Sequence, residues 1–186
     1  QTNNAQVYLF EDYFQKKKMI ACGPTVLAMA LDISAWPLNV FPNGEQPEDS
    51  ILMILHNPAN LELFKKIRDI DYDIYPPNEV PQLYPAVTEM IYQDKNVCHF
   101  KWGLTLDMCK YLIDNDICVM VSGDFPAGGH YVLIVGYEDN ELIFNDPYNL
   151  QWPDNNGYNR RMSKEFFETN VKPRGYRLEI YKNRGA

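Results

Sequence analysis

Long apolar runs are missing from this sequence. Its 186 residues are 46% hydrophobic and 13% aromatic, which suits a globular chain that can bury a sizeable core. Apolar stretches such as residues 117–121 and 131–135 are far short of the roughly 18 residues that a membrane helix needs. We therefore expect no membrane span in this chain.

Basic charge is also in short supply. Lys and Arg number 17 against 25 Asp and Glu, which gives a net charge of −8 and a pI of about 4.8. A nucleic-acid binder needs a basic surface to neutralise phosphates, and the one basic run, at residues 16–18, is more typical of a solvated turn. The composition therefore predicts no nucleic-acid partner.

Cysteine and histidine are too sparse for a metal or disulfide scaffold. The four cysteines stand at positions 22, 98, 109 and 118 with no Cys-x-x-Cys spacing, which argues against a zinc knuckle and against a small disulfide-stapled fold. Cys98 and His99 are adjacent, and alternation along a strand would send them to opposite faces. We predict no metal ion and no other cofactor.

The order of the predicted elements indicates an α+β fold. Helices are expected at 22–32, 47–56, 58–70 and 105–115, the second and third each opened by a proline and the fourth capped by Thr105. The many prolines between 71 and 85 predict a long ordered loop rather than a regular element. Strands follow at 117–121, 131–137, 142–146 and 176–181, with a short helix near 163–168. Helices followed by an antiparallel sheet define the α+β class.

Cys22 is the strongest candidate for a nucleophile. It precedes Gly23 and Pro24 at the start of an apolar helix, where unpaired backbone N–H groups and the positive end of the helix dipole favour a thiolate. Gly23 would leave room for a substrate carbonyl, and the backbone N–H of Cys22 would point at the developing oxyanion. The alternative is a small buried cysteine that fills space.

His130 stands at the mouth of a predicted strand, and Asp146 ends the next one. In a hairpin with a two- or four-residue loop centred on Asp139 and Asn140, Asp146 would oppose Leu133 and lie on the face opposite His130. With a three-residue loop at 138–140, Asp146 would oppose Val132 and become a diagonal neighbour of His130, within reach of its ring. We therefore expect an odd-length loop or a β-bulge in this hairpin.

This geometry predicts a Cys-His-Asp triad. Asp146 would accept a hydrogen bond from one ring nitrogen of His130 and fix its tautomer, while the other nitrogen serves Cys22 as base and then as acid. The structural alternatives are a satisfied strand-end histidine and an Asx turn before Pro147. His56 is a weaker candidate, because it ends a predicted helix where the dipole favours a cation.

Three motifs together resemble the papain-like cysteine peptidases, most closely the bacteriocin-processing double-glycine leader peptidases and their stand-alone relatives. The motifs are Cys22-Gly-Pro-Thr on a helix, Gly129-His-Tyr-Val-Leu-Ile-Val-Gly-Tyr on a strand and Asn145-Asp-Pro on the next. The resemblance implies a single papain-like domain over 1–186, with a helical lobe at about 1–115, a sheet lobe at about 116–186 and a substrate cleft between them.

One position departs from the family pattern. Relatives place a glutamine six residues before the cysteine to donate a hydrogen bond to the oxyanion, whereas Lys16 stands there in this chain. Gln15, seven residues before Cys22, would take this role if the intervening loop absorbs one extra residue.

The resemblance implies peptide-bond hydrolysis through an acyl-enzyme intermediate, with Cys22, His130 and Asp146 as the triad and Gln15 as oxyanion donor. The same residues would serve an amidase, a deamidase or an acyl transferase, and a third hypothesis is a peptide-binding module without turnover. The expected partner is a peptide or protein substrate. The family and the absent initiator methionine point to a bacterial module of a larger protein, secreted or at the cell surface, although a cytoplasmic setting is also compatible.

Overall fold

A single antiparallel sheet runs through the protein. The computed structural model describes residues 21–42, 46–74, 76–126, 128–148, 152–154 and 156–185. Within these ranges six strands pair in the order β1-β6-β2-β3-β4-β5. The strands are β1 (Cys98–Trp102), β2 (Cys118–Phe125), β3 (Gly128–Glu138), β4 (Glu141–Asn145), β5 (Arg160–Met162) and β6 (Tyr176–Ile180).

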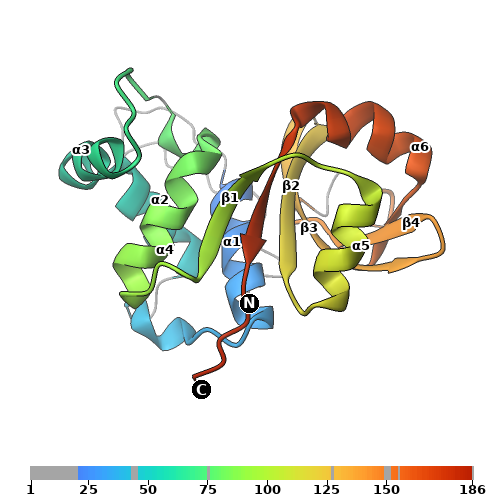
Figure 1. The fold of residues 1–186 in the computed structure, drawn as a ribbon, viewed down its shortest axis with the longest axis horizontal. Helices are drawn as coiled ribbons and strands as arrows, with labels where there is room; N and C mark the ends of the chain where they lie inside the picture. The colour runs from blue at the N-terminus through green and yellow to red at the C-terminus, as the bar shows by residue number, and fades with distance from the viewer. Residues whose placement is uncertain are drawn as a thin grey trace.

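The helix α1 lies at the centre of the molecule, between the sheet and a group of helices (Figure 1). The group consists of α2 (Pro47–His56), α3 (Pro58–Ile67) and α4 (Tyr84–Tyr92), and α1 itself spans Cys22–Ile33. On the other side α5 (Leu106–Asp114) and α6 (Lys164–Phe166) accompany the sheet. None of the described helices is long and apolar enough to cross a membrane.

Short irregular turns connect these elements. Three of them are 3-10 turns in the helical part, η1 (Leu38–Val40), η2 (Pro77–Glu79) and η3 (Pro81–Leu83). A π turn (Phe167–Val171) and the 3-10 turn η6 (Lys172–Arg174) lead from α6 into β6. Gly175 joins η6 to β6 with a φ of 73°, a conformation that favours glycine.

Local chemistry explains where the helices begin. Pro47 and Pro58 open α2 and α3, because a proline at the first helical position loses no hydrogen bond. The side chain of Asn57 accepts the N–H of Ala59 at 3.0 Å. Thr105 caps α5 by accepting the N–H of Met108 at 3.1 Å, as its position in the sequence predicts.

Two apolar cores lie on the two faces of the sheet. Residues 23–31 of α1 are buried and pack in one core with strand residues such as Met120 and Leu133. Their sequence neighbours Val121 and Val132 belong to the second core, under α5 and α6, because successive side chains of a strand alternate between faces. Burial on every side of α1 fits its apolar sequence.

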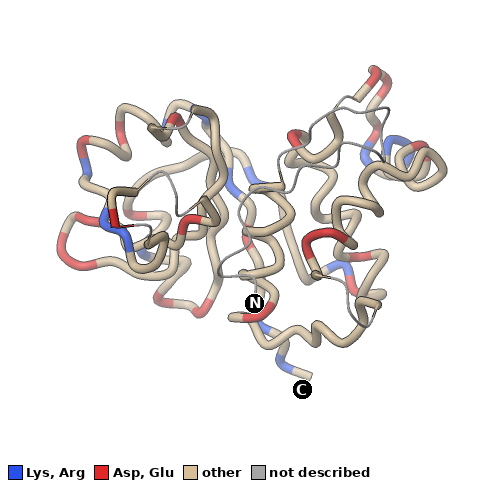
Figure 2. The backbone as a smooth tube through the Cα atoms, turned by 180° about the vertical axis from the view of Figure 1, so that it is seen from behind, with Lys and Arg blue, Asp and Glu red and all other residues tan. Residues whose placement is uncertain are grey.

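Charged residues are dispersed over the molecule. Acidic positions occur on both halves, and basic positions lie among them (Figure 2). Several charges form exposed ion pairs, such as Arg174 with Asp124 at 2.5 Å and Arg161 with Glu141 at 3.0 Å. Such exposed pairs contribute little to stability, typically about 0–1 kcal/mol each.

The α+β class is confirmed, and so are most of the predicted elements. The helix at Pro47–His56 has the expected bounds, whereas α3 ends at Ile67, three residues earlier than expected. The expectation of a loop without regular structure over 71–85 is wrong at its end, because α4 begins at Tyr84. Pro85 occupies the first turn of that helix, where the missing N–H costs nothing.

Two short strands were not predicted. The three-residue β5 is too short to show a period, and β1 has no clean alternation of buried and exposed residues. β1 pairs with β6, so the sheet includes one strand from the part of the sequence assigned to the helical lobe. The division into lobes near residue 115 stays a prediction.

Candidate active site

Cys22 is the first residue of α1 and is half-buried at the edge of a cleft. The cleft has a volume of about 370 Å³, and α1, η2, β2, β3 and the start of β6 contribute its walls. Both Cys22 and His130 line it. The backbone N–H of a first helical residue has no partner inside the helix, so α1 itself makes no use of the N–H of Cys22.

Gly23 makes room for a tyrosine rather than for a substrate. A Cβ atom on Gly23 would lie 2.0 Å from the hydroxyl oxygen of Tyr84. The Tyr84 ring is fully buried, and its hydroxyl donates a hydrogen bond to the Asn78 carbonyl oxygen at 2.7 Å. The predicted role of Gly23 is therefore wrong, because the tyrosine already fills the space beside its Cα atom.

Asn78 connects this tyrosine with the helical part of the protein. Its side-chain oxygen lies 2.9 Å from Nε2 of His56, and Asn78 itself lines the cleft beside Cys22. Burial lowers the pKa of His56, although the hydrogen bond with Asn78 opposes this shift. Burial at the end of α2 thus acts against the cationic form of His56, which the helix dipole was expected to favour.

His130 is held between a carboxylate and a thiol. Its Nε2 atom lies 2.6 Å from Oδ1 of Asp146, and the ring also hydrogen-bonds Cys22. Burial lowers the pKa of His130, but the hydrogen bonds to Asp146 and Cys22 outweigh it and raise the pKa to about 9. Since Nε2 faces the carboxylate, Nδ1 is the atom left for the sulfur.

The register of the β3–β4 hairpin places Asp146 beside His130. Glu138 pairs with Glu141 across a two-residue loop, but the register shifts between Ile134 and Gly136, so that Leu133 pairs with Asn145. The predicted β-bulge is therefore confirmed, and the three-residue loop is wrong. The extra residue in β3 brings Asp146 onto the face of the sheet that carries His130.

Asp146 is buried and receives several hydrogen bonds. Its side chain has no exposed surface. Oδ1 accepts the N–H of Tyr148 at 2.7 Å, and Oδ2 accepts the indole N–H of Trp152 at 2.8 Å. The bond to Tyr148 forms the Asx turn that was considered as an alternative, so the turn and the contact with His130 coexist and together fix the carboxylate.

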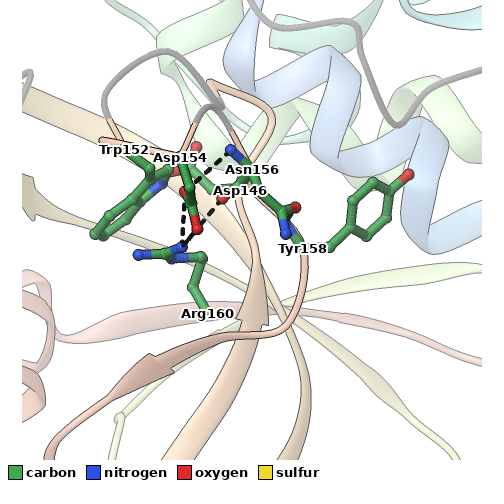
Figure 3. Close-up of polar contacts among 6 residues, drawn as sticks. All are labelled: Asp146, Trp152, Asp154, Asn156, Tyr158 and Arg160. Carbon is green, nitrogen blue, oxygen red and sulfur yellow. Dashed lines mark hydrogen bonds and ion pairs between the residues drawn. The ribbon is translucent and has the colours of Figure 1, made fainter.

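Trp152 belongs to a small polar cluster around this carboxylate (Figure 3). The guanidinium of Arg160 lies 4.3 Å from the centroid of the Trp152 ring, and Arg160 also pairs with Asp154 at 2.9 Å. Sequence reasoning missed Trp152. The available signal was a tryptophan six residues after Asp146 in a polar loop, where an indole N–H needs an acceptor if it is buried.

The remaining predicted residues lie apart from this cluster or outside the described ranges. Gln15 is outside the residues that the structure describes. Cys98, Cys109 and Cys118 are buried, and burial raises the pKa of each thiol, to about 12 for Cys109. Among the described residues no group of three or more His, Cys, Asp or Glu side chains is placed to hold a metal ion.

The helix that begins at Cys22 packs against the antiparallel sheet that carries His130, and this is the papain-like fold expected from the sequence. The chain belongs to the Peptidase_C39-like family, whose model matches residues 9–177. A search of the curated proteins finds no match. The family and the fold support a cysteine peptidase.

Two solved structures resemble the chain. One is assigned as a C39-like peptidase from Bacillus anthracis, with 12% identity, a TM-score of 0.54 and coverage of 96% of this chain and 98% of that one. The other is the peptidase domain of Streptococcus ComA, a bifunctional ABC transporter involved in quorum sensing, with 16% identity, a TM-score of 0.43 and coverage of 96% and 99%. At such identities, the first likeness shows a shared fold.

Proposed function

We propose that the protein hydrolyses peptide bonds with Cys22 as nucleophile, His130 as acid and base, and Asp146 as the group that orients the imidazole. The observation that carries the proposal is that His130 hydrogen-bonds both Asp146 and Cys22 at the edge of one cleft. A nucleophile beside a base, with the base held by a third group, is the arrangement that covalent catalysis requires.

The first half of the reaction forms an acyl-enzyme. The Cys22 sulfur, as a thiolate paired with the protonated His130, adds to the carbonyl carbon of the scissile bond. As the tetrahedral intermediate collapses, the C–N bond breaks and His130 gives its proton to the departing amine. Asp146 holds the imidazole in position, and the hydrogen bonds that both of its oxygens accept keep the carboxylate itself in place.

The second half restores the enzyme. His130 takes a proton from water, and the resulting hydroxide adds to the thioester carbonyl and displaces the Cys22 sulfur, which leaves a carboxylic acid product. In both halves the carbonyl oxygen becomes negative and needs donors. The backbone N–H of Cys22 supplies one, and Gln15 is proposed from the sequence to supply the other.

Mass spectrometry of a broad peptide library incubated with the chain tests this proposal. We expect fragments from the unaltered protein, a thioester adduct on Cys22 after rapid acid quenching, and no fragments with Cys22→Ala. Cys118→Ala is the matched control, because Cys118 is buried away from the cleft. Fragments produced by Cys22→Ala would contradict the nucleophile, and release of ammonia without fragments would indicate an amidase or a deamidase.

A further inference from the structure

Four neighbouring strands place a row of side chains along one end of the sheet. Trp102 pairs with Tyr176 between β1 and β6, and Ser122 pairs with Tyr131 between β2 and β3. The two tyrosine hydroxyl oxygens lie 3.1 Å apart. This row leads from the strand that carries His130 to the outer edge of β1.

The row is part of the cleft at one end and open to solvent at the other. Tyr176, Ser122 and Tyr131 line the cleft together with Cys22. Trp102 is 69% exposed, the most exposed of the large apolar side chains in the described residues. A solvent-exposed tryptophan beside a proposed catalytic cleft is typical of a binding surface.

Two rings of this row, Trp102 and Tyr176, form a cluster with the neighbouring Phe100. We call this cluster the aromatic wall. Trp102 meets Tyr176 edge to face, with ring centroids 6.3 Å apart and an angle of 90°. Phe100 lies 5.1 Å from Trp102 and 5.6 Å from Tyr176, centroid to centroid. Because each ring is fixed by the other two, the wall is preformed and would lose little conformational entropy on binding.

The wall also joins the catalytic cleft to a second hollow. Phe100 lines a depression of about 460 Å³, to which Gln82 and Pro85 also contribute, and Tyr176 lines the cleft. Since Phe100 and Tyr176 are in contact, the two hollows adjoin along the wall. With volumes of about 370 and 460 Å³, the two hollows together have room for more than one residue of a peptide.

We propose that the aromatic wall is a substrate subsite that receives a large apolar side chain of the peptide, aromatic or of the leucine and methionine type, beside the scissile bond. The inference rests on the proposed peptidase activity and adds a sequence preference to it. Burial of such a side chain against three rings removes apolar surface of both partners from water. A small or charged side chain would gain much less.

Two peptides that differ only at one position test the proposal. From the library described above, a cleaved peptide with phenylalanine near the scissile bond is compared with its alanine analogue. We expect Trp102→Ala to lower kcat/KM for the phenylalanine peptide by about 10-fold more than for the alanine peptide, the size of effect that one apolar contact produces. Tyr111→Ala is the matched control, since Tyr111 is 62% exposed but lines a different pocket.

A binding measurement separates this inference from the proposed function. In the Cys22→Ala background, calorimetric titration should show tighter binding of the phenylalanine peptide, and Trp102→Ala should remove the difference. Selective binding of the phenylalanine peptide, without cleavage by the unaltered chain, would contradict the proposed peptidase activity and support the proposed subsite. If Trp102→Ala cleaves with the same preference for phenylalanine over alanine as the unaltered chain, the proposed subsite is contradicted and the proposed peptidase activity is supported.

Discussion

Gly23 and Tyr84 occupy complementary space beneath the proposed nucleophile. The tyrosine hydroxyl stands where a Cβ atom on residue 23 would be, 2.0 Å from its ideal position. The same hydroxyl binds the Asn78 carbonyl at 2.7 Å. Tyr84 thus lies between the start of α1 and the turn η2, which form two walls of the cleft, and sets the distance between them.

Replacement of Gly23 by alanine should therefore destabilise the protein and displace the start of α1. Forcing an extra methyl group into a packed core costs about 1–3 kcal/mol, which urea unfolding followed by circular dichroism would measure. Tyr84→Phe removes the oxygen at 2.0 Å, so the double variant should recover part of the loss. Purely additive losses in the double variant would show that the two positions do not compete for space.

Cysteine reactivity should separate Cys22 from the other three thiols. We expect iodoacetamide near pH 6, followed by peptide mapping, to alkylate Cys22 well before Cys98, Cys109 and Cys118. Burial raises the pKa of those three thiols, while Cys22 is half-buried at a cleft and hydrogen-bonded to His130. The thiolate is the reactive form, and a neighbouring imidazolium favours it.

The control for this labelling is His130→Gln, which removes the imidazolium and keeps a polar side chain. Alkylation of Cys22 should become slower in that variant, while the three buried cysteines should not change. Equal rates at Cys22 with and without His130 would contradict the proposed ion pair.

Folding stability should fall as the pH rises from about neutral to above 9. The native pKa of His130 is about 9, above the 6.5 or so of an unfolded chain, so the native state holds the proton more tightly. The resulting stabilisation is complete below pH 6.5 and is lost as the pH rises through 9. Urea unfolding of the unaltered protein and of His130→Gln should show a difference in unfolding free energy that shrinks over this interval. If the difference in unfolding free energy grows instead, folding lowers the pKa of His130 rather than raising it.

Trp152→Phe should slow catalysis without unfolding the protein. The substitution keeps an aromatic ring against Arg160 but removes the donor that binds Oδ2 of Asp146 at 2.8 Å. A hydrogen bond to a charged group contributes about 1.5–3 kcal/mol, so we expect kcat to fall by roughly 10- to 100-fold, with a shifted pH profile because Asp146 is less firmly held. We place Trp152 as a positioning residue, since it acts on the reacting atoms through its hydrogen bond to Asp146.

A matched tryptophan elsewhere provides the control for that variant. The indole N–H of Trp36 donates to the Tyr181 carbonyl oxygen at 2.7 Å, and neither residue lines the cleft. Trp36→Phe should lower stability by a similar amount and leave the pH profile of kcat in place. A shifted profile in both variants would indicate a general effect of lost stability rather than a role for Trp152.

The part of the fold that follows from local chemistry was predictable. Prolines and cap residues mark the starts of α2, α3 and α5, and alternation in β3 and β4, with its requirement for a bulge, brought His130 and Asp146 together. Each of these signals is local, and even His130 and Asp146 are only 16 residues apart. The contact of Gly23 with Tyr84 depends instead on how distant segments of the chain pack. Neither hydrophobic periodicity nor capping residues predict such packing.

Residues 23–31 of α1 are buried, so the amide protons of this stretch are shielded from solvent, whereas the last turn, with Ile33, is exposed. Deuterium should enter residues 23–31 far more slowly than the end of the helix. The sulfur of Cys22 is thus attached to the start of a well-protected segment, and we expect its distance from the imidazole to change little while the chain stays folded.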